Sequence, residues 1–177
     1  VRQAVQGGAT LVQLREKHGP DSQVRPLARR LLEVLRPLQV PLIMNDRVEL
    51  ARDIGAAGAH IGQDDMHPEQ ARGLLGPDAI LGLTVKNLDQ IRQAENLDVD
   101  YLGVGPVFPS ATKPDAGEPW GLSGLAEARK IASKPLVAIG GIGLENARQI
   151  MCSGVDGIAV VSAICSAPSP REAAKQL

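Results

Sequence analysis

The fold is decided by the stretch Pro41-Leu-Ile-Met-Asn-Asp-Arg-Val-Glu-Leu-Ala-Arg-Asp-Ile-Gly-Ala-Ala-Gly-Ala-His-Ile-Gly-Gln-Asp-Asp65. Two short apolar runs enclose an amphipathic segment, residues 48–54, and this order predicts a strand, a helix and a second, parallel strand. Asp46 and Asp65 follow the two runs, so both carboxylates are expected at the same end of the sheet. Two carboxylates in that position can hold a hard divalent cation such as Mg²⁺, with phosphate oxygens completing its shell.

The same alternation extends along the rest of the chain. Short apolar runs predict strands at residues 10–14, 40–44, 59–61, 80–84, 101–104, 136–139 and 157–161. Amphipathic segments predict helices at residues 24–38, 48–54, 68–75, 88–96, 122–132 and 144–152. One plan of helix end, small or acidic turn and apolar strand recurs at residues 55–62, 98–105 and 153–160. Such repetition indicates an α/β fold of the (β/α)₈ TIM-barrel type, in a single domain over residues 1–177.

The predicted strands number seven, one fewer than this barrel requires. Residues 1–8 read as the end of a helix that is closed by glycine. If the fold is an eight-stranded barrel, its first strand precedes residue 1, and the loss of that strand leaves two unpaired edges. We therefore expect an N-terminally truncated barrel.

Composition excludes several classes of protein. The 177 residues carry a net charge of −1 and only 2% aromatic side chains, which argues against a nucleic-acid partner. No apolar stretch is long enough to cross a bilayer and no secretory signal opens the chain, so we expect a soluble, cytoplasmic protein without a membrane partner. Cys152 and Cys165 are expected to be small buried hydrophobes. The sequence leaves a homo-oligomer open.

Barrel enzymes place their chemistry at the carboxyl ends of the strands. After the first visible strand, alternation puts Gln13, Arg15 and Lys17 on one side. A basic pair with an amide suits a pyrophosphate or a heteroaromatic ring, and a solvated strand end is the alternative.

The acidic residues have a competing role as helix caps. Asn45 or Asp46 could cap the helix at residues 48–54, and Asp65 could cap the next helix. Each residue alone is better explained as a cap, whereas the two acids at successive strand ends favour a metal site. Asp64 is the alternative ligand to Asp65, and the residues alone do not separate them.

Two strand residues carry polar groups into the same region. Thr84 ends the strand at residues 80–84, where its hydroxyl either binds a phosphate or closes the strand. His60 is expected to pack or to form hydrogen bonds rather than to catalyse.

The longest irregular stretch, residues 103–121, follows a strand, and loops of this length are usually functional. Ser110, Thr112 and Lys113 supply two hydroxyls and a cation, which suit phosphate oxygens. The stretch is therefore expected to bind a phosphate, and a solvated loop is the alternative.

The last two predicted strands end in small residues. Gly140 and Gly141 expose backbone N–H groups, and Val161 and Ser162 end the neighbouring strand. Barrels often bind phosphate in these loops, and a tight turn is the purely structural alternative.

With these residues assembled, the chain resembles the thiamine-phosphate synthase family. The matching segments are Val12-Gln-Leu-Arg-Glu-Lys17, Leu42-Ile-Met-Asn-Asp-Arg47, His60-Ile-Gly-Gln-Asp-Asp65, Gly103-Val-Gly-Pro-Val-Phe-Pro-Ser-Ala-Thr-Lys113, Val137-Ala-Ile-Gly-Gly-Ile142 and Val160-Val-Ser-Ala-Ile164. The segments span nearly the whole chain, and the Gly-Gln-x-Asp and Gly-Pro-x-Phe/Tyr-Pro-x-x-Thr-Lys motifs are fairly specific. Residues 85–87 differ from the short polar stretch that often follows the Ser/Thr position in the family.

The resemblance implies a transferase with small phosphorylated substrates. It would join hydroxymethylpyrimidine pyrophosphate to hydroxyethylthiazole phosphate, giving thiamine phosphate and pyrophosphate. Mg²⁺ is the implied cofactor, with Asp46 and Asp65 as its ligands, and Arg15, Lys17 and Lys113 are the implied catalytic residues. The pyrimidine substrate would contact Gln13, Arg15, Lys17, Asn45 and Thr84. The thiazole phosphate would contact Ser110, Thr112, Gly140, Gly141, Val161 and Ser162.

Two other functions compete with this one. A related thiazole tautomerase shares the barrel but needs no grip on Mg²⁺ and pyrophosphate. A phosphate-binding barrel without turnover is the second alternative. The basic and acidic residues that the chain retains together favour the synthase.

Overall fold

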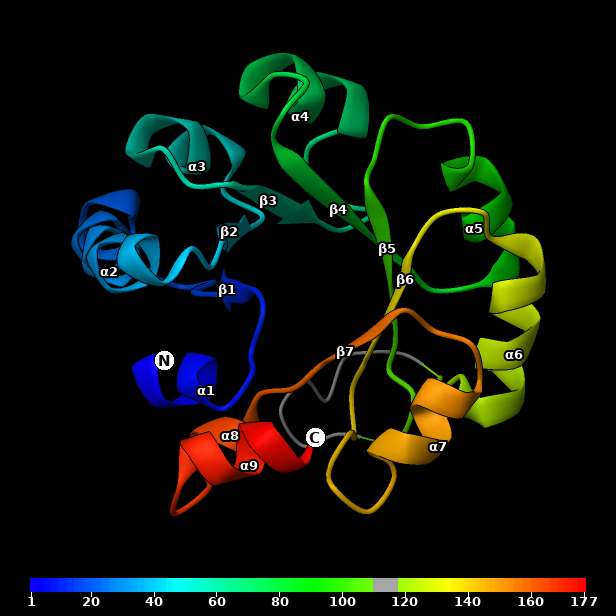
Figure 1. The fold of residues 1–177 in the computed structure, drawn as a ribbon. Coiled ribbons are helices and arrows are strands. Elements are labelled where there is room, and N and C mark those ends of the chain that lie inside the picture. Colours follow the sequence, from blue (N-terminus) through cyan, green and yellow to red (C-terminus); the bar gives the residue numbers. More distant parts are fainter. Residues whose placement is uncertain (110–117) are drawn as a thin grey trace.

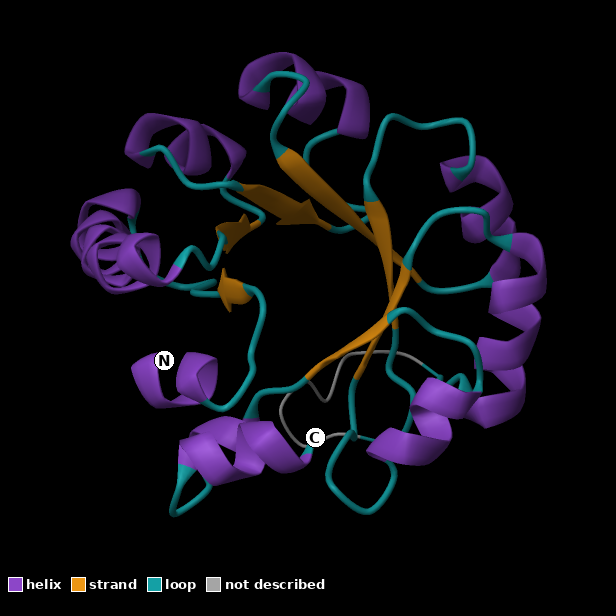
Figure 2. Ribbon diagram, viewed as in Figure 1, coloured by secondary structure: helices purple, strands orange, loops and turns teal. Residues whose placement is uncertain are grey.

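The computed structural model of the chain describes residues 1–109 and 118–177. Seven parallel strands form one sheet in the order β1 to β7, each paired with the next along the chain. The sheet curls round a central axis and the helices lie on its outside (Figure 1, Figure 2). The strands are β1 (Val12–Leu14), β2 (Leu42–Asn45), β3 (Gly58–Ile61), β4 (Ile80–Val85), β5 (Tyr101–Val104), β6 (Leu136–Ile139) and β7 (Gly157–Ala159).

Helices alternate with these strands along the described residues. They are α1 (Arg2–Gln6), α2 (Asp21–Leu35), α3 (Val48–Ile54), α4 (Pro68–Leu75), α5 (Leu88–Ala94), α6 (Gly121–Ile131), α7 (Ala147–Cys152), α8 (Ser162–Cys165) and α9 (Pro170–Gln176), with a 3₁₀ turn, η1, at Arg36–Leu38. Each strand and the helix after it form one unit, so the carboxyl ends of all seven strands meet at one rim of the sheet.

The predicted α/β fold is confirmed as a curled, TIM-barrel-like sheet. All seven predicted strands are present, with ends that shift by at most two residues. The last strand is shorter than predicted, because β7 ends at Ala159 and the chain turns into α8 at Ser162. β1 and β7 are the edges of the described sheet, and an eighth strand before residue 1 stays a prediction.

The helix predictions fail mainly at helix ends. The helix predicted at residues 24–38 begins earlier, at Asp21, and gives way to η1 after Leu35, because Pro37 lacks the N–H group that would continue it. The amphipathic patterns predict neither α8 nor α9. The signal for α9 is present, since the Ser169 hydroxyl accepts the N–H of Glu172 at 3.4 Å, as in a capping box.

Apolar residues fill the space between the sheet and the helices. Every residue of β2 is buried, which is typical of a parallel strand covered on both faces. The largest fully buried side chains are Leu35, Leu42, Ile43, Met44, Leu50, Ile61, Leu81, Ile91, Leu102, Leu125, Leu136 and Ile150. These side chains come from most of the strands and helices. They form one core, which holds the strand ends in fixed positions relative to one another.

The first and last helices pack together. α1 lies beside α9, across the space between β1 and β7 (Figure 1). A Cβ atom on Gly7, which follows α1, would lie 2.2 Å from the carbonyl oxygen of Arg171 in α9. Only glycine allows the two backbones this approach, so the pairing of helices joins the two edges of the described fold.

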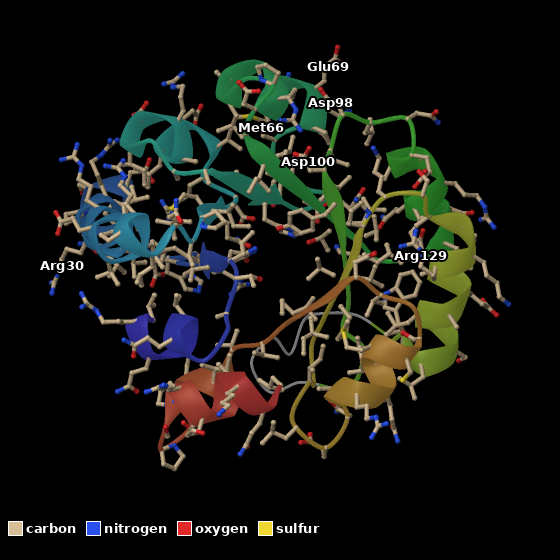
Figure 3. The ribbon with its side chains drawn as sticks, viewed as in Figure 1. Arg30, Met66, Glu69, Asp98, Asp100 and Arg129 are labelled. Atoms are coloured by element: carbon tan, nitrogen blue, oxygen red, sulfur yellow. The ribbon has the colours of Figure 1, made fainter. Side chains whose placement is uncertain are left out.

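Two arginine–aspartate pairs fasten the amino ends of the strands. Arg72 on α4 pairs with Asp100 at 2.8 Å, and the same carboxylate accepts a backbone N–H of β4 at 2.7 Å. Arg129 on α6 pairs with Asp156 at 2.9 Å, and that carboxylate accepts a backbone N–H of β6 at 2.8 Å. Figure 3 shows Asp100 with Asp98 beside α4. Each pair therefore ties a helix to two neighbouring strands.

The prediction of buried cysteines is wrong. Cys152 and Cys165 are both free and exposed. Each is the last residue of a short helix, where the chain turns away from the core. Within residues 1–109 and 118–177, no helix combines the length and the apolar character needed to cross a membrane.

Candidate active site

Asp46 lies in the turn between β2 and α3. Its φ is 63°, a left-handed conformation that residues other than glycine seldom adopt. Its N–H donates to the carbonyl of His60 at 2.8 Å, which ties the turn to the end of β3. The N-cap of α3 is Arg47, and no side chain caps the helix. The alternative role of Asp46 as a helix cap is therefore wrong.

Asp65 lies after β3, next to Asp46. One of its oxygens accepts the backbone N–H of Gly62 at 2.7 Å, and its carboxyl is close enough to that of Asp46 to raise the pKa of Asp46. His67 caps α4, so the cap interpretation of Asp65 is wrong as well. Asp64 instead lies 3.6 Å from Lys86, with its side chain 94% exposed. The fold thus brings Asp65, and not Asp64, to Asp46.

The two carboxylates are not balanced by positive charge. Partial burial raises the pKa of Asp46, the Asp65 carboxyl raises it further, and Lys17 lowers it in part. The Lys17 Nζ lies 3.5 Å from the Asp46 Oδ2, so one described cation faces two carboxylates. A further cation at this position would relieve their repulsion.

The available ligands fit Mg²⁺. Among the described residues, no three His, Cys, Asp or Glu side chains are grouped to hold a metal. Within residues 1–109 and 118–177, the site therefore contributes two carboxylate groups at most. Mg²⁺ typically binds to one or two carboxylates and takes its other ligands from water and substrate phosphates.

A chain of polar side chains crosses the inner face of the sheet. The Tyr101 Oη lies 2.8 Å from the His60 Nδ1, and the His60 Nε2 lies 2.7 Å from the Thr84 Oγ1. Gln13 lies near the phenol of Tyr101 and lowers its pKa in part, but burial is the main influence and raises that pKa. The prediction that His60 forms hydrogen bonds is confirmed. Gln13 and Thr84, both predicted site residues, are linked through the two rings.

Glycines in two strands make room for these rings. A Cβ atom on Gly82 would lie 2.2 Å from the Tyr101 Cζ and 2.5 Å from the His60 Nδ1. A Cβ atom on Gly103 would lie 2.8 Å from the His60 Cε1. Glycine inside a strand often marks such a close approach. These two glycines, which no prediction from the sequence used, are the signal that could have indicated a close approach of side chains here.

The loop after β1, the turn after β2 and the start of α3 line an open cavity of about 280 Å³ beside Asp46. Lys17, Asn45, Asp46 and Arg47 are among the residues that line it. Asn45 is buried at the end of β2, whereas Arg15 and Lys17 are exposed on the loop. The fold thus gathers the predicted basic and acidic residues of β1, β2 and β3 at one edge.

The predicted phosphate-binding turns lie after β6 and β7. Gly140 and Gly141 have φ values of 98° and 68°. Cβ atoms on them would lie 2.8 Å and 2.7 Å from the segment that follows β5, so both positions require glycine. Val161 is the N-cap residue of α8, and Ser162 begins that helix. Ser110, Thr112 and Lys113 lie outside the described residues.

Two residues of the site were not predicted from the sequence. Tyr101 completes the polar chain, but an aromatic residue in a strand is usually interpreted as part of the core. Arg47 donates hydrogen bonds to two carbonyls of the loop after β1, and these bonds hold that loop in place. No periodicity in the sequence reveals a contact between a side chain and backbone carbonyls 28 and 31 positions away.

Comparison with known proteins identifies the family. A family model described as thiamine monophosphate synthase matches residues 1–164. The chain belongs to this family. The thiamine-phosphate synthase of Azorhizobium caulinodans is 48% identical over 177 residues, which cover 100% of this chain and 84% of the relative. The predicted family and its enzyme class, a transferase, are thereby confirmed.

Solved structures agree with the sequence comparison. The thiamine phosphate pyrophosphorylase from Pyrococcus furiosus superposes with a TM-score of 0.89 at 36% identity, covering 99% of this chain and 84% of that chain. The orotidine 5'-phosphate decarboxylase from Pyrococcus horikoshii gives a TM-score of 0.72 at 17% identity, covering 98% of this chain and 88% of that one. This second likeness concerns the fold alone.

Proposed function

We propose that the chain joins hydroxymethylpyrimidine pyrophosphate to hydroxyethylthiazole phosphate, forming thiamine phosphate and releasing pyrophosphate. The observation that carries the proposal is the Asp46–Asp65 pair, which faces Lys17 at the carboxyl end of the sheet. The names of the relatives agree with this reaction.

Asp46 and Asp65 would hold Mg²⁺, which would neutralise charge on the pyrophosphate when bound. Lys17 and Arg15 follow β1 at the same end of the sheet and would bind the remaining phosphate oxygens. Lys113 belongs to this basic group by resemblance. A leaving group that gains negative charge departs more easily among fixed positive charges.

The pyrimidine ring would lie against the polar chain on the inner face of the sheet. Gln13 and Thr84 present an amide and a hydroxyl there, and Asn45 adds a buried amide at the end of β2. The thiazole phosphate would lie on the opposite side of the rim. Its contacts would be Gly140, Gly141, Val161, Ser162, Ser110 and Thr112.

We infer a dissociative displacement. The bond between the pyrimidine methylene carbon and the pyrophosphate oxygen breaks with its electron pair on oxygen, and the thiazole nitrogen then supplies the pair for the new C–N bond. No proton has to be removed from the nucleophile. The hydrogen bonds of His60 to Tyr101 and Thr84 are consistent with a structural role for this histidine rather than a role as a general base.

The proposal also covers the fold and location of the whole protein. In a closed barrel of eight strands, the eighth strand would lie between β1 and β7 and pair with both. We also expect one domain over residues 1–177 and a cytoplasmic location for the reaction.

The test measures thiamine phosphate formation by the purified chain with both substrates, with Mg²⁺ and with EDTA. We expect turnover with Mg²⁺ only, and none when either substrate is omitted. A chain that isomerises the thiazole phosphate alone, and does so equally well in EDTA, is a tautomerase. Binding of both phosphorylated compounds without any product identifies a binding module. Either result contradicts the proposal.

A further inference from the structure

Arg47 makes contacts that none of the roles given above uses. Its guanidinium donates to the carbonyl of Glu16 from Nε at 3.1 Å and from Nη2 at 2.7 Å. Nη2 also donates to the carbonyl of Gly19 at 2.6 Å, and Nη1 pairs with the Asp21 carboxylate at 2.5 Å. The Arg47 side chain is only 18% exposed, so water competes weakly for these contacts.

The acceptors of Arg47 bracket the loop between β1 and α2. Glu16 and Gly19 lie on either side of Lys17, and Asp21 is the first residue of α2. Residues 15–20 belong to no helix or strand. A single side chain therefore contacts this loop at two points and also contacts the first residue of the helix that follows it.

The turn that carries Arg47 also carries Asp46. With Asp46 in the left-handed conformation, the two adjacent side chains reach different neighbours. Asp46 contacts Asp65 and Lys17, whereas Arg47 contacts the loop. Because Lys17 lies on that loop, the turn and the loop form a closed ring of contacts.

We propose that Arg47 is a positioning residue, which holds residues 15–20 so that Lys17 faces the Asp46–Asp65 pair before substrate binds. The proposal rests on the proposed function, in which Lys17 binds the pyrophosphate. A loop that is already ordered loses less conformational entropy on binding, so the affinity for the pyrophosphate substrate rises.

The chemistry of the contacts requires arginine at this position. The planar guanidinium presents several N–H groups in fixed directions, and here they reach two carbonyls and one carboxylate. Lysine keeps the charge but offers one compact ammonium group. Arg47→Lys therefore removes most of the hydrogen bonds to the loop while leaving the net charge unchanged.

Amide hydrogen exchange in the substrate-free protein tests the positioning role directly. In Arg47→Lys we expect amide exchange at residues 16–21 to be about tenfold faster, because the loop opens more often. Arg52→Lys is the matched control. Arg52 lies on α3, the helix that Arg47 precedes as N-cap, but its side chain is 50% exposed and pairs with the neighbouring Asp53. The control should leave exchange in the loop unchanged.

The KM values for the two substrates distinguish a positioning role of Arg47 from a merely structural one. In Arg47→Lys, the KM for the pyrimidine pyrophosphate should rise about tenfold to a hundredfold, and the KM for the thiazole phosphate should stay the same. A merely structural role lowers the folded fraction and leaves both KM values unchanged. Equal increases in both KM values also contradict the proposal.

The two proposals fail in different ways. Absence of thiamine phosphate from the unaltered chain overturns the proposed function but leaves the exchange result standing. Unchanged exchange at residues 16–21 in Arg47→Lys overturns the positioning role, whatever the activity. If that variant does not fold, Asp21→Asn removes only the ion pair. Its loop should exchange faster by a smaller factor, and no acceleration there overturns the proposal.

Discussion

The two ends of the strands use aspartates in opposite ways. At the amino ends, Asp100 and Asp156 each pair with an arginine and accept a backbone N–H from a neighbouring strand. At the carboxyl ends, Asp46 and Asp65 face each other, and Lys17 pairs with the first. The amino-end carboxylates have matched partners, whereas the carboxyl-end pair has surplus negative charge.

This difference distinguishes a structural role from a binding role. A carboxylate that meets a cation and a backbone donor stabilises the joint between helix and strand. Two carboxylates in contact repel each other and raise the pKa of at least one of them, which costs stability unless a ligand supplies positive charge. The same residue type therefore has its function set by its neighbours.

Loss of Asp65 should have the largest effect. We expect Asp65→Asn to lower kcat/KM about a thousandfold, because the proposed Mg²⁺ site loses one of its two carboxylates. The melting temperature should hold or rise, since the repulsion with Asp46 disappears. Steady-state kinetics and thermal unfolding check the two parts.

Asp64→Asn is the matched control for that variant. Asp64 is the adjacent acid, but it faces Lys86 on the solvent side. We expect kcat/KM within about twofold of the unaltered chain. A large loss in Asp64→Asn together with a small loss in Asp65→Asn would reverse the assignment of the two residues.

Breaking an amino-end pair should change stability and not chemistry. Arg72→Met should lower the free energy of unfolding by about 2–3 kcal/mol, because Asp100 and several backbone carbonyls lose a donor. Arg129→Met should cost less, since the Arg129 side chain is 27% exposed and that of Arg72 is 10% exposed. Denaturant unfolding measures both. A fall in kcat per folded molecule contradicts a purely structural role.

The polar chain inside the sheet should have an intermediate effect. Tyr101→Phe removes the hydroxyl between His60 and Gln13. We expect a loss of about 1 kcal/mol in the free energy of unfolding and a fall in kcat/KM of less than about tenfold. An unchanged stability would show that these hydrogen bonds contribute nothing in solution.

The smallest effect is a pH dependence of stability in metal-free protein. Because the pKa of Asp46 is raised by folding, ionising this carboxyl costs stability. The cost is absent below the unfolded pKa of about 3.9, grows as the pH rises through the raised value, and is complete above it. Asp46→Asn should therefore raise the melting temperature at neutral pH, and the gain should vanish towards acid pH.

Two features allow the effect of Asp46→Asn on stability to be assigned to the charge. Asparagine tolerates the left-handed φ of residue 46 at least as well as aspartate, and any benefit from this is independent of pH. Asp78→Asn, at an exposed position, is the control. A gain that persists unchanged at acid pH would point to the backbone rather than to the charge.

The sequence predicts the sheet because strand and helix patterns alternate with little interruption. It also predicts that Asp46 and Asp65 meet, because parallel strands end at the same rim. It does not separate Asp64 from Asp65, since the residue that turns inward depends on the path of the loop after β3. That path is fixed by the hydrogen bond from the loop backbone to the Asp65 carboxylate.

The sequence does not predict contacts between side chains and residues that are far apart along the chain. The positions of Arg47 and Tyr101 follow from the packing of separate βα units, which no local pattern encodes. The strand glycines at 82 and 103 do indicate close approach, but they do not name the rings that occupy the space. The burial of residues at the ends of short helices is also poorly specified, as the exposed Cys152 illustrates.

The most direct test of the account is calorimetric binding of inorganic pyrophosphate with and without Mg²⁺. The unaltered chain should bind pyrophosphate at least about tenfold more tightly with Mg²⁺, and the double variant Asp46→Asn/Asp65→Asn should lose this enhancement. An equal enhancement by Mg²⁺ in the double variant would contradict the assignment of the carboxyl-end pair as the metal site.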